Sequence, residues 1–370
     1  MVCKIADNIF SPLGFTTEEN YQHVRQGCSG VRRHEGWRGL PYPFAASLFD
    51  WNRVQLVDGF TPFESIVIRS VEGALAQTDV DAASPSVLFV LSTTKGNVDL
   101  LEAPSPASAM QRLPLGAAAQ VVASYFGNPN MPVVVSNACI SGLNAQIVAM
   151  RALQCGSYDT VVVVGADVLS RFIVSGFGSF KALAAEPCRP FDIERFGLNL
   201  GEAAATIIYR RAEAGSWHAV RGAIRNDAHH VANPSPKGEG CYRALRYVMQ
   251  GQSAGDIAFV GTHGTSTLYN DEMESAAIDR AGLLAVPVNS LKGYYGHTMG
   301  AAGVLETVLS MRALDDGIVL GTKGFATMGV SHPLNVSASH RTTDKRAFVK
   351  LLSGFGGCNA AMLFKKGGMA

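Results

Sequence analysis

Charged residues are scarce in this chain. Asp, Glu, Lys and Arg make up 16% of its 370 residues and leave a formal net charge of +1. No basic run of the kind that binds nucleic acid is present. Long apolar runs are missing as well, since strings such as residues 161–165 are far shorter than the roughly 20 residues that cross a bilayer. With Lys4 and Asp7 in place of an apolar signal core, the sequence predicts a cytoplasmic protein with no membrane span and no nucleic-acid partner.

Cysteine is present, but it follows no pattern. The seven cysteines are an odd number at irregular spacing, which argues against a disulfide framework. The chain contains no Cys-x-x-Cys pair and no His-x-x-x-His pair, so we expect no structural metal. Most of these cysteines are expected to be small buried apolar residues.

Short β-branched runs alternate with helical patterns along the chain. Residues 87–91, 133–135, 161–164 and 205–209 are predicted to be buried strands. Thr16 and Glu19 have the spacing of a capping box that opens a helix. Strands that alternate with helices predict an α/β fold with a mostly parallel sheet. The 39 glycines and 47% hydrophobic residues fit a sheet covered on both faces and a surface buried by a partner subunit.

Two segments of the chain resemble each other faintly. Residues 133–153 and 286–314 each read as a strand, a turn of small residues and a helix that closes with Met-Arg-Ala-Leu. A second echo pairs Phe89-Val90 before Thr93 with Phe259-Val260 before Thr262. A duplication would place the two turns near each other across a pseudo-twofold axis.

Cys139 lies where a predicted buried strand ends and a predicted helix begins. The unpaired N–H groups and partial positive charge of a helix N-terminus favour a thiolate, which is the nucleophilic form of cysteine. Ser141 and Gly142 would let the backbone turn tightly beside a substrate. Cys139 is therefore a candidate nucleophile, and the alternative is a buried cysteine at a strand end.

Two histidines occupy similar small-residue turns. His263 lies in GTHGTST after the predicted strand 257–260, and His297 lies in KGYYGHTMGAAG at the mouth of the second repeated helix. Lys292 comes five residues before His297. A thiol that faces imidazoles is an acyl-transfer arrangement. The alternatives are a histidine satisfied within a polar turn and an ordinary surface lysine.

Two further segments carry candidate functional residues. The turn Gly354-Phe355-Gly356-Gly357 lies between apolar runs and can aim backbone N–H groups at an oxyanion, although it fits a plain hairpin equally well. Residues 225–240 are rich in Pro, Gly, Asn and His and predict a long loop, which inside a compact domain is usually functional or mobile.

Taken together, the motifs NACISG, THGTST, KGYYGHTMGAAG and SGFGGCN, in this order, resemble the β-ketoacyl-acyl-carrier-protein synthases. The likeness covers nearly the whole chain and includes CRPFDIERFGLNLGEAAA from Cys188. It implies a thiolase-like five-layer αβαβα fold built from two duplicated halves, usually as a homodimer. The halves would be residues 1–212, with the nucleophilic cysteine, and residues 213–370, with both catalytic histidines.

The resemblance also implies a reaction, in which Cys139 takes an acyl group from a carrier-protein phosphopantetheine thioester. A malonyl thioester then loses carbon dioxide, and its carbanion attacks the acyl group to give a β-keto product longer by two carbons. The implied partners are acyl carrier protein and the acyl and malonyl thioesters, with no permanently bound cofactor. The pathway would be that of fatty acids, polyketides or aryl polyenes.

Site roles follow from the motif matches. His263 and His297 would stabilise the enolate, and the N–H groups of Cys139 and Phe355 would form the other oxyanion hole. The remaining matches assign Phe355 as the gate, Lys292 to the local network with Glu274 as its ionic partner, and Thr265 and Thr267 to the pantetheine arm. His297 stands where the chain-initiating branch of the superfamily has Asn, which points to the elongating Cys-His-His branch.

Departures from the family pattern leave other functions open. Ser353 stands where a Phe is common and Leu198 where Phe is frequent, so the acyl substrate is not fixed. One alternative is a non-catalytic chain-length subunit of a heterodimer, and another is a thiolase-type acyltransferase with Cys358 as its second cysteine. An acidic carrier protein would need a basic patch, for which Arg53, Lys181 and Arg195 are the candidates.

Overall fold

Eleven strands form one mixed sheet in the part of the chain that the computed structural model describes, residues 1–102, 104–213 and 215–367. Their order is β13-β11-β10-β15-β16-β9-β1-β8-β6-β4-β5. The strands of the first half of the chain are β1 (Val2–Phe10), β4 (Val87–Ser92), β5 (Val133–Val135), β6 (Thr160–Asp167) and β8 (Ala203–Arg211). Those of the second half are β9 (Trp217–Asn226), β10 (Ile257–Gly261), β11 (Pro287–Asn289), β13 (Asn335–Val336), β15 (Ala347–Gly354) and β16 (Cys358–Lys366).

Helices and two small sheets complete the described structure. The helices are α1 (Thr17–Arg25), α2 (Pro62–Leu75), α3 (Ala107–Met110), α4 (Leu115–Tyr125), α5 (Ser141–Gln154), α6 (Arg171–Ser179), α7 (Glu239–Val248), α8 (Leu268–Arg280), α9 (Lys292–Tyr295) and α10 (Ala302–Asp315). The small sheets pair β2 (Val31–His34) with β3 (Phe44–Ser47) and β7 (Leu200–Gly201), and β12 (Ile318–Val319) with β14 (Arg341–Thr342). Among the described residues, no helix combines the length and the apolar character that a membrane crossing needs.

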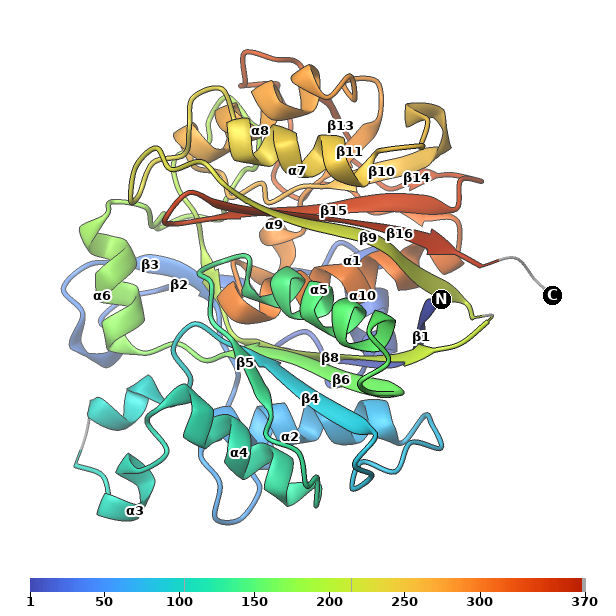
Figure 1. Ribbon diagram of the computed structural model, residues 1–370. Helices are drawn as coiled ribbons and strands as arrows, with labels where there is room; N and C mark the ends of the chain where they lie inside the picture. The colour runs from blue at the N-terminus through green and yellow to red at the C-terminus, as the bar shows by residue number, and fades with distance from the viewer. Residues whose placement is uncertain (103, 214, 368–370) are drawn as a thin grey trace.

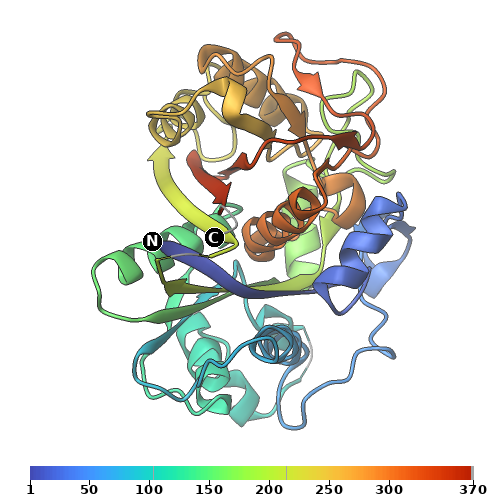
Figure 2. The ribbon, with the colours of Figure 1, turned by 90° about the vertical axis from the view of Figure 1, so that its right-hand side faces the viewer.

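The elements stack in five layers (Figure 1). Helices α2 and α4 cover one face of the part of the sheet that holds β4, β6 and β8, and helices α7 and α8 cover the outer face of the part that holds β9, β15 and β16. Helices α5 and α10 lie between these two parts, and Figure 2 shows the orange helix α10 enclosed by strands on both sides. The predicted five-layer αβαβα arrangement is confirmed.

The two parts of the sheet have the same internal order. In the first, β4 pairs in parallel with β5 and β6, and the antiparallel β8 and β1 follow. In the second, β10 pairs in parallel with β11 and β15, and the antiparallel β16 and β9 follow. The parts join where β1 meets β9. This repeat supports our proposal of two halves that divide at residues 212 and 213, a point between β8 and β9; residues 103, 214 and 368–370 lie outside the described residues.

Local sequence signals explain the elements that carry the site. Strand β6 is buried along its whole length, as its unbroken Val run predicts. The Thr16 side chain accepts the Glu19 N–H while the Glu19 carboxylate accepts the Thr16 N–H, which confirms the predicted capping box. The predicted long loop is also present, since residues 227–238 connect β9 to α7.

Helices α5 and α10, which follow the two repeated turns, contact each other through glycine. A Cβ atom at Gly303 would lie 2.2 Å from the backbone nitrogen of Leu143, and one at Gly142 would lie 2.9 Å from the backbone nitrogen of Gly303. The Gln146 amide donates hydrogen bonds to the Gly142 and Gly303 carbonyls across this contact. The absence of a side chain at both positions lets the two helix mouths approach closely.

The contact predicts that Gly303→Ala lowers the free energy of unfolding by about 3 kcal/mol, because backbone atoms of the facing helix would have to move. Urea unfolding followed by circular dichroism measures the change. Gly116→Ala in α4 is the control, since an added Cβ there meets no atom within 4 Å. Equal unfolding midpoints for the two variants would contradict the prediction.

Candidate active site

Cys139 lies on a sharp turn between β5 and α5. Ala138 has a φ of 46°, a left-handed conformation that costs a non-glycine residue roughly 1–2 kcal/mol. The Ser141 hydroxyl stabilises this turn by accepting the Asn137 N–H and donating to the Ala138 carbonyl. Helix α5 then begins at Ser141. The turn therefore presents the buried Cys139 side chain at the mouth of the helix, as predicted.

His263 lies two residues after β10, in a turn held by a buried carboxylate. The Glu274 side chain, from α8, accepts the backbone N–H groups of His263 and Gly264 at 2.7 Å each. Gly264 has a φ of 47°, and a Cβ there would contact the Ser290 side chain at 2.5 Å. The small residues of the GTHGTST motif are thus required for the turn.

His297 lies between α9 and α10 and is fixed by its backbone. Its N–H donates to the Asn199 carbonyl, and its own carbonyl accepts the Gly201 N–H. The Nδ1 atom accepts the Met299 N–H at 3.2 Å. Because Nδ1 is an acceptor, a neutral His297 ring carries its proton on Nε2.

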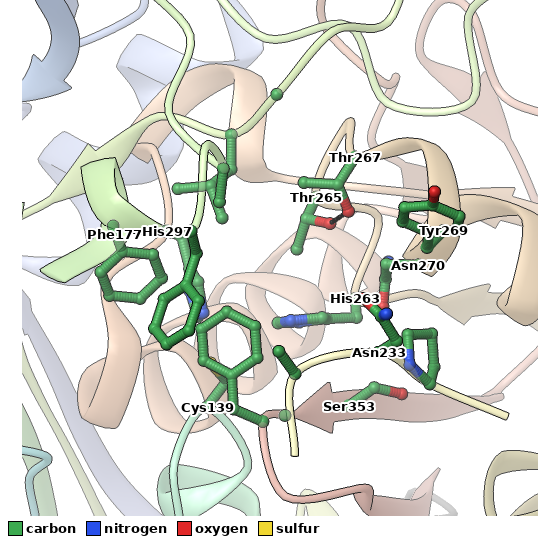
Figure 3. A pocket seen from close by; sticks show the side chains of 18 of the residues that line it. Cys139, Phe177, Asn233, His263, Thr265, Thr267, Tyr269, Asn270, His297 and Ser353 are labelled. Carbon is green, nitrogen blue, oxygen red and sulfur yellow. Dashed lines mark hydrogen bonds between the residues drawn. The ribbon is translucent and has the colours of Figure 1, made fainter. Parts of the chain in front are cut away.

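The three side chains converge, as predicted. The Cys139 Sγ and one ring nitrogen of each histidine lie within 4.8 Å of one another. The two imidazole rings are 4.9 Å apart at an interplanar angle of 83°. Figure 3 shows all three facing one cavity of about 250 Å³, which they line together. The His263 Nδ1 and His297 Nε2 atoms are buried with no hydrogen-bond partner among the described residues.

The Cys139 thiol is protonated at rest, which corrects the expectation of a thiolate. Burial raises the pKa of Cys139 to about 12, while the Lys292 charge and a hydrogen bond from the Phe355 N–H lower this pKa by less. Desolvation penalises the charged form, and here it outweighs the favourable position at a helix mouth. A thiol in this state has to lose its proton before it can act as a nucleophile.

Both imidazoles are neutral. Burial lowers the pKa of His263 and of His297 well below the usual value, and the positive charges of Lys292 and Lys350 lower it further. A neutral imidazole can accept a proton at one nitrogen and donate a hydrogen bond from the other. The pair can therefore serve both as proton acceptor and as hydrogen-bond donor near neutral pH.

Lys292 is buried, and its ionic partner is Glu306 of α10. The expectation that Glu274 would pair with Lys292 is wrong, since Glu274 binds backbone N–H groups instead and supports the His263 turn. Lys350 of β15 also contacts Glu306, with Nζ 2.5 Å from Oε2. One carboxylate thus joins two buried ammonium groups, and these charges lower the pKa of Glu306.

The Gly-rich turn after β15 lies beside the nucleophile. The Phe355 N–H contacts the Cys139 sulfur, and the Phe355 ring packs against Phe177 and Phe180 at centroid distances of 5.7 and 5.2 Å. The long loop holds this turn, because the Gly356 N–H donates to the Val231 carbonyl. Phe355 lies beside Cys139 as predicted, and the long loop, whose position was not predicted, also lines the cavity.

Two residues that depart from the family pattern line the cavity, whereas Cys358, the candidate second cysteine, does not. Ser353 and Leu198 line the cavity, so both substitutions change the site itself. Cys358 is absent from the cavity wall, and its Sγ contacts the Phe355 and Asn137 carbonyls at 3.3 and 3.8 Å. Burial raises the pKa of Cys358 to about 11. This thiol does not face the substrate space as a second catalytic cysteine would.

The opposite wall of the cavity is polar at depth and apolar at the rim. Thr265 and Thr267 line it with their hydroxyl oxygens 2.9 Å apart (Figure 3). Large exposed side chains surround the opening, namely Phe180, Phe196, Leu268 and Tyr269.

Among the predicted basic residues, Lys181 is at this rim. Arg195 is instead buried, and its guanidinium donates to the Asp192 and Gly329 carbonyls. Arg53 does not line the cavity.

Sequence reasoning missed three charged residues. Glu306 and Lys350 are single charges within apolar runs (GVLETVL and AFVKLLS), a signal for a paired buried charge because such residues are almost never buried alone. Asp167 is buried at the end of β6 and accepts the Thr93 hydroxyl and the Gly300 N–H at 2.8 and 2.7 Å. It thereby joins the end of β6 to the segment that leads into α10.

Cys139, His263 and His297 also have the donor types and spacing of a zinc site. The ammonium groups of Lys292 and Lys350 act on both imidazoles. Their positive charge would repel a divalent cation in a site of low dielectric constant. The prediction of no bound metal is therefore supported by the electrostatics of the site and stays a prediction.

Comparison with known proteins identifies the family. The β-ketoacyl synthase N-terminal and C-terminal domain families match residues 69–214 and 219–326. A 3-oxoacyl-(acyl-carrier-protein) synthase 2 of Mycobacterium leprae is 30% identical over 71% of this chain and 67% of its own. The enzyme of that name from Rhizobium meliloti is 28% identical over 96% of both chains. The chain therefore belongs to the β-ketoacyl synthase family and is an acyltransferase-class condensing enzyme.

Solved structures agree on the fold, which is thiolase-like. A β-ketoacyl synthase from Burkholderia phymatum superposes with a TM-score of 0.90 at 23% identity, covering 99% of each chain. A ketosynthase in complex with its chain length factor from Xenorhabdus doucetiae gives a TM-score of 0.87 at 22% identity, covering 99% of this chain and 98% of that one.

The buried charges predict a large effect of Glu306→Gln. Two ammonium groups would lose their shared counter-ion, so the free energy of unfolding should fall by about 3–5 kcal/mol. Urea unfolding measures this loss of free energy. Glu18→Gln is the control, because Glu18 pairs with Arg312 at the surface, where an ion pair contributes about 0–1 kcal/mol. A loss at Glu306 no larger than at Glu18 would show that the pairing is weak.

Proposed function

We propose that this protein elongates acyl chains held on a carrier protein by decarboxylative condensation with a malonyl thioester. The observation that carries the proposal is the convergence of the Cys139 sulfur and the two imidazoles at the base of one cavity. Family membership supports it, and the curated relatives are named for acyl-carrier-protein substrates. No permanently bound cofactor takes part.

The first half-reaction transfers the acyl group to Cys139. As the protonated thiol attacks the thioester carbonyl, its proton passes to a neutral imidazole. His263 is the better acceptor, because no hydrogen bond from the described residues fixes its tautomer, whereas the Met299 N–H donates to His297 Nδ1. The N–H groups of Cys139 and Phe355 hold the oxyanion. The carrier thiolate leaves and takes the proton from the imidazolium.

The second half-reaction extends the chain. His263 and His297 donate N–H hydrogen bonds to the carbonyl oxygen of the malonyl thioester, so the enolate formed with the loss of carbon dioxide is stabilised. Its carbon attacks the acyl-Cys139 carbonyl, the C–S bond breaks, and the sulfur leaves as a thiolate that takes its proton from solvent water. Thr265 and Thr267, at the polar wall, are placed to bind the amide groups of the pantetheine arm.

We further propose that the carrier protein docks at the rim around Lys181. Four exposed apolar side chains surround the opening there, and a phosphopantetheine arm has to enter through it to reach Cys139. Lys181 offers a positive charge for an acidic carrier, while Arg195 is buried and cannot do so.

We propose a dimer as the functional unit. Strand β5 ends the central sheet with one open edge, and its Val133 and Val134 are only partly buried. An open edge strand is a template for pairing with another chain. A second copy is the simplest partner, and the chain length factor bound to the Xenorhabdus ketosynthase is a precedent for a heterodimer. We place the reaction in the cytoplasm.

The proposal predicts that only Cys139 becomes acylated. Incubation with a panel of acyl-carrier proteins, followed by peptide mass spectrometry, should locate the acyl group on Cys139 and report the preferred chain. Cys139→Ala should lose condensation by at least about 10³-fold, because the covalent step disappears.

Cys358→Ala is the matched control, and it should still accept the acyl group on Cys139. Full condensation by Cys139→Ala would refute the mechanism. An inert wild-type chain that becomes necessary in a heterodimer would favour the chain-length subunit, and turnover of acetoacetyl-CoA without carrier protein would favour the thiolase.

The docking proposal predicts that Lys181→Glu lowers kcat/KM by about tenfold with carrier-bound substrate at low salt, since rim charges mainly set association rates. With N-acetylcysteamine thioesters, which lack the carrier, the activity should match the wild type. Arg151→Glu is the control, because Arg151 is exposed near the far end of α5. An equal loss with both substrate types would contradict docking at this rim.

A further inference from the structure

Lys350 is a buried lysine that the proposed mechanism leaves without a role. It lies on β15, where it is opposite Gly261 in the parallel pairing with β10. Its side chain is almost fully buried. The Nζ atom donates to the Gly261 and Thr262 carbonyls at 3.0 and 2.8 Å and lies 2.5 Å from a Glu306 carboxylate oxygen.

These contacts join the segments that carry the two histidines and the Phe355 turn. Thr262 is the residue directly before His263. Glu306 lies on α10, whose mouth holds His297, and it also binds Lys292 of α9. Strand β15 itself continues to Gly354 and the Phe355 turn. A side chain that donates to two carbonyls and forms an ion pair with one carboxylate at this junction fixes the segments relative to one another.

The local charge is unbalanced. Lys292 and Lys350 share the single carboxylate of Glu306, so the cluster carries an excess of one positive charge. A lone Lys292–Glu306 pair would already be neutral. A buried lysine is costly, so the second ammonium group calls for an explanation beyond the stability of the pair.

We propose that Lys350 is a positioning residue for the condensing reaction, which holds the His263 turn through the two carbonyls and supplies the positive charge that keeps both imidazoles neutral and favours the enolate. This inference rests on the proposed function, in which negative charge develops at the thioester oxygen beside the two rings. The excess charge would stabilise that oxygen without contacting it.

All charged groups near the rings bear on this role. Lys292, Lys350 and the neighbouring imidazole lower the pKa of His263, and the two lysines lower that of His297. The anions in reach are Glu306 of α10 and Glu274 of α8, which raise the pKa of Lys350, together with Asp167 of β6, which acts on Cys139. Burial lowers the pKa of Lys350, and the Glu306 carboxylate at 2.5 Å keeps the ammonium form.

The direction of the pH effect follows. His297 has to be neutral, because its Nδ1 accepts the Met299 N–H and a protonated ring would lose this bond, so activity is lost as the pH falls through the pKa of the ring in the folded enzyme. Removal of a nearby positive charge raises this pKa. The acid limb of malonyl decarboxylation should therefore move to higher pH in Lys350→Met, by about one pH unit.

Three variants separate the two parts of the role. Lys350→Met removes the charge and the donor and leaves a neutral Lys292–Glu306 pair. Lys350→Gln removes the charge but keeps an N–H donor. Lys345→Met is the matched control, because Lys345 also donates to a β10 carbonyl, that of Ile257 at 3.2 Å, at the opposite end of the strand from His263.

The pH profile of carbon dioxide release from malonyl-carrier protein is the first measurement. We expect both Lys350 variants to shift the acid limb equally, and Lys350→Met also to lose about tenfold in kcat with little change in KM. Lys345→Met should behave as the wild type. Alkylation of Cys139 by iodoacetamide and a thermal melt verify that each variant is folded.

Nuclear magnetic resonance of chains labelled with ¹⁵N-histidine is the second measurement, and it requires no activity. The ring nitrogens of His263 and His297 should titrate at higher pH in Lys350→Gln than in the wild type. Unchanged titration in a folded Lys350 variant would overturn the inference. A wild type that does not condense acyl groups, but whose histidine titration still shifts when Lys350 is replaced, would refute the proposed function. The electrostatic role of Lys350 would then remain supported.

Discussion

The site depends on the contact of two glycines. Gly142 and Gly303 let the mouths of α5 and α10 approach until backbone atoms touch, and Cys139 and His297 lie just before these mouths. Any side chain at either position would separate the nucleophile from the imidazole. The two repeated segments of the chain meet at this contact. Each copy supplies a strand, a turn and a helix, but the turns carry different residues, and together these residues form one site.

Burial then determines the protonation states around that contact. It keeps the Cys139 thiol protonated and both imidazoles neutral, while Glu306 stays charged only because two lysines surround it. The positive charge of the site therefore lies on the two lysines, whereas the thiol and the imidazoles are neutral. In the proposed reaction the malonyl thioester brings a carboxylate into the cavity, and the enolate forms where the two lysines already make the potential positive.

Sequence patterns located several strands, and the family resemblance supplied the layer order and the central residues. The predicted mostly parallel sheet was wrong, since half of the strand pairings in the main sheet are antiparallel. The Val runs at 133–135 and 161–164 became β5 and part of β6, and the motif residues Cys139, His263 and His297 met as predicted. The prediction of which residues form ion pairs was wrong. Glu274 and Lys292 are close in motif order, yet the partner of Lys292 lies one helix further along the chain. Partners across a fold are set by packing, which spacing does not encode, and the resting state of Cys139 depended on burial that a helix mouth alone does not reveal.

The protonated state of Cys139 has a consequence for chemical durability. Peroxides and other oxidants react with a thiolate far more readily than with a thiol. A cysteine whose pKa burial raises to about 12 is therefore spared between turnovers, in contrast to redox sensors that keep an exposed thiolate. In the proposed reaction the thiolate forms only as the thioester is attacked, which limits the time during which Cys139 can enter the irreversible steps of cysteine oxidation.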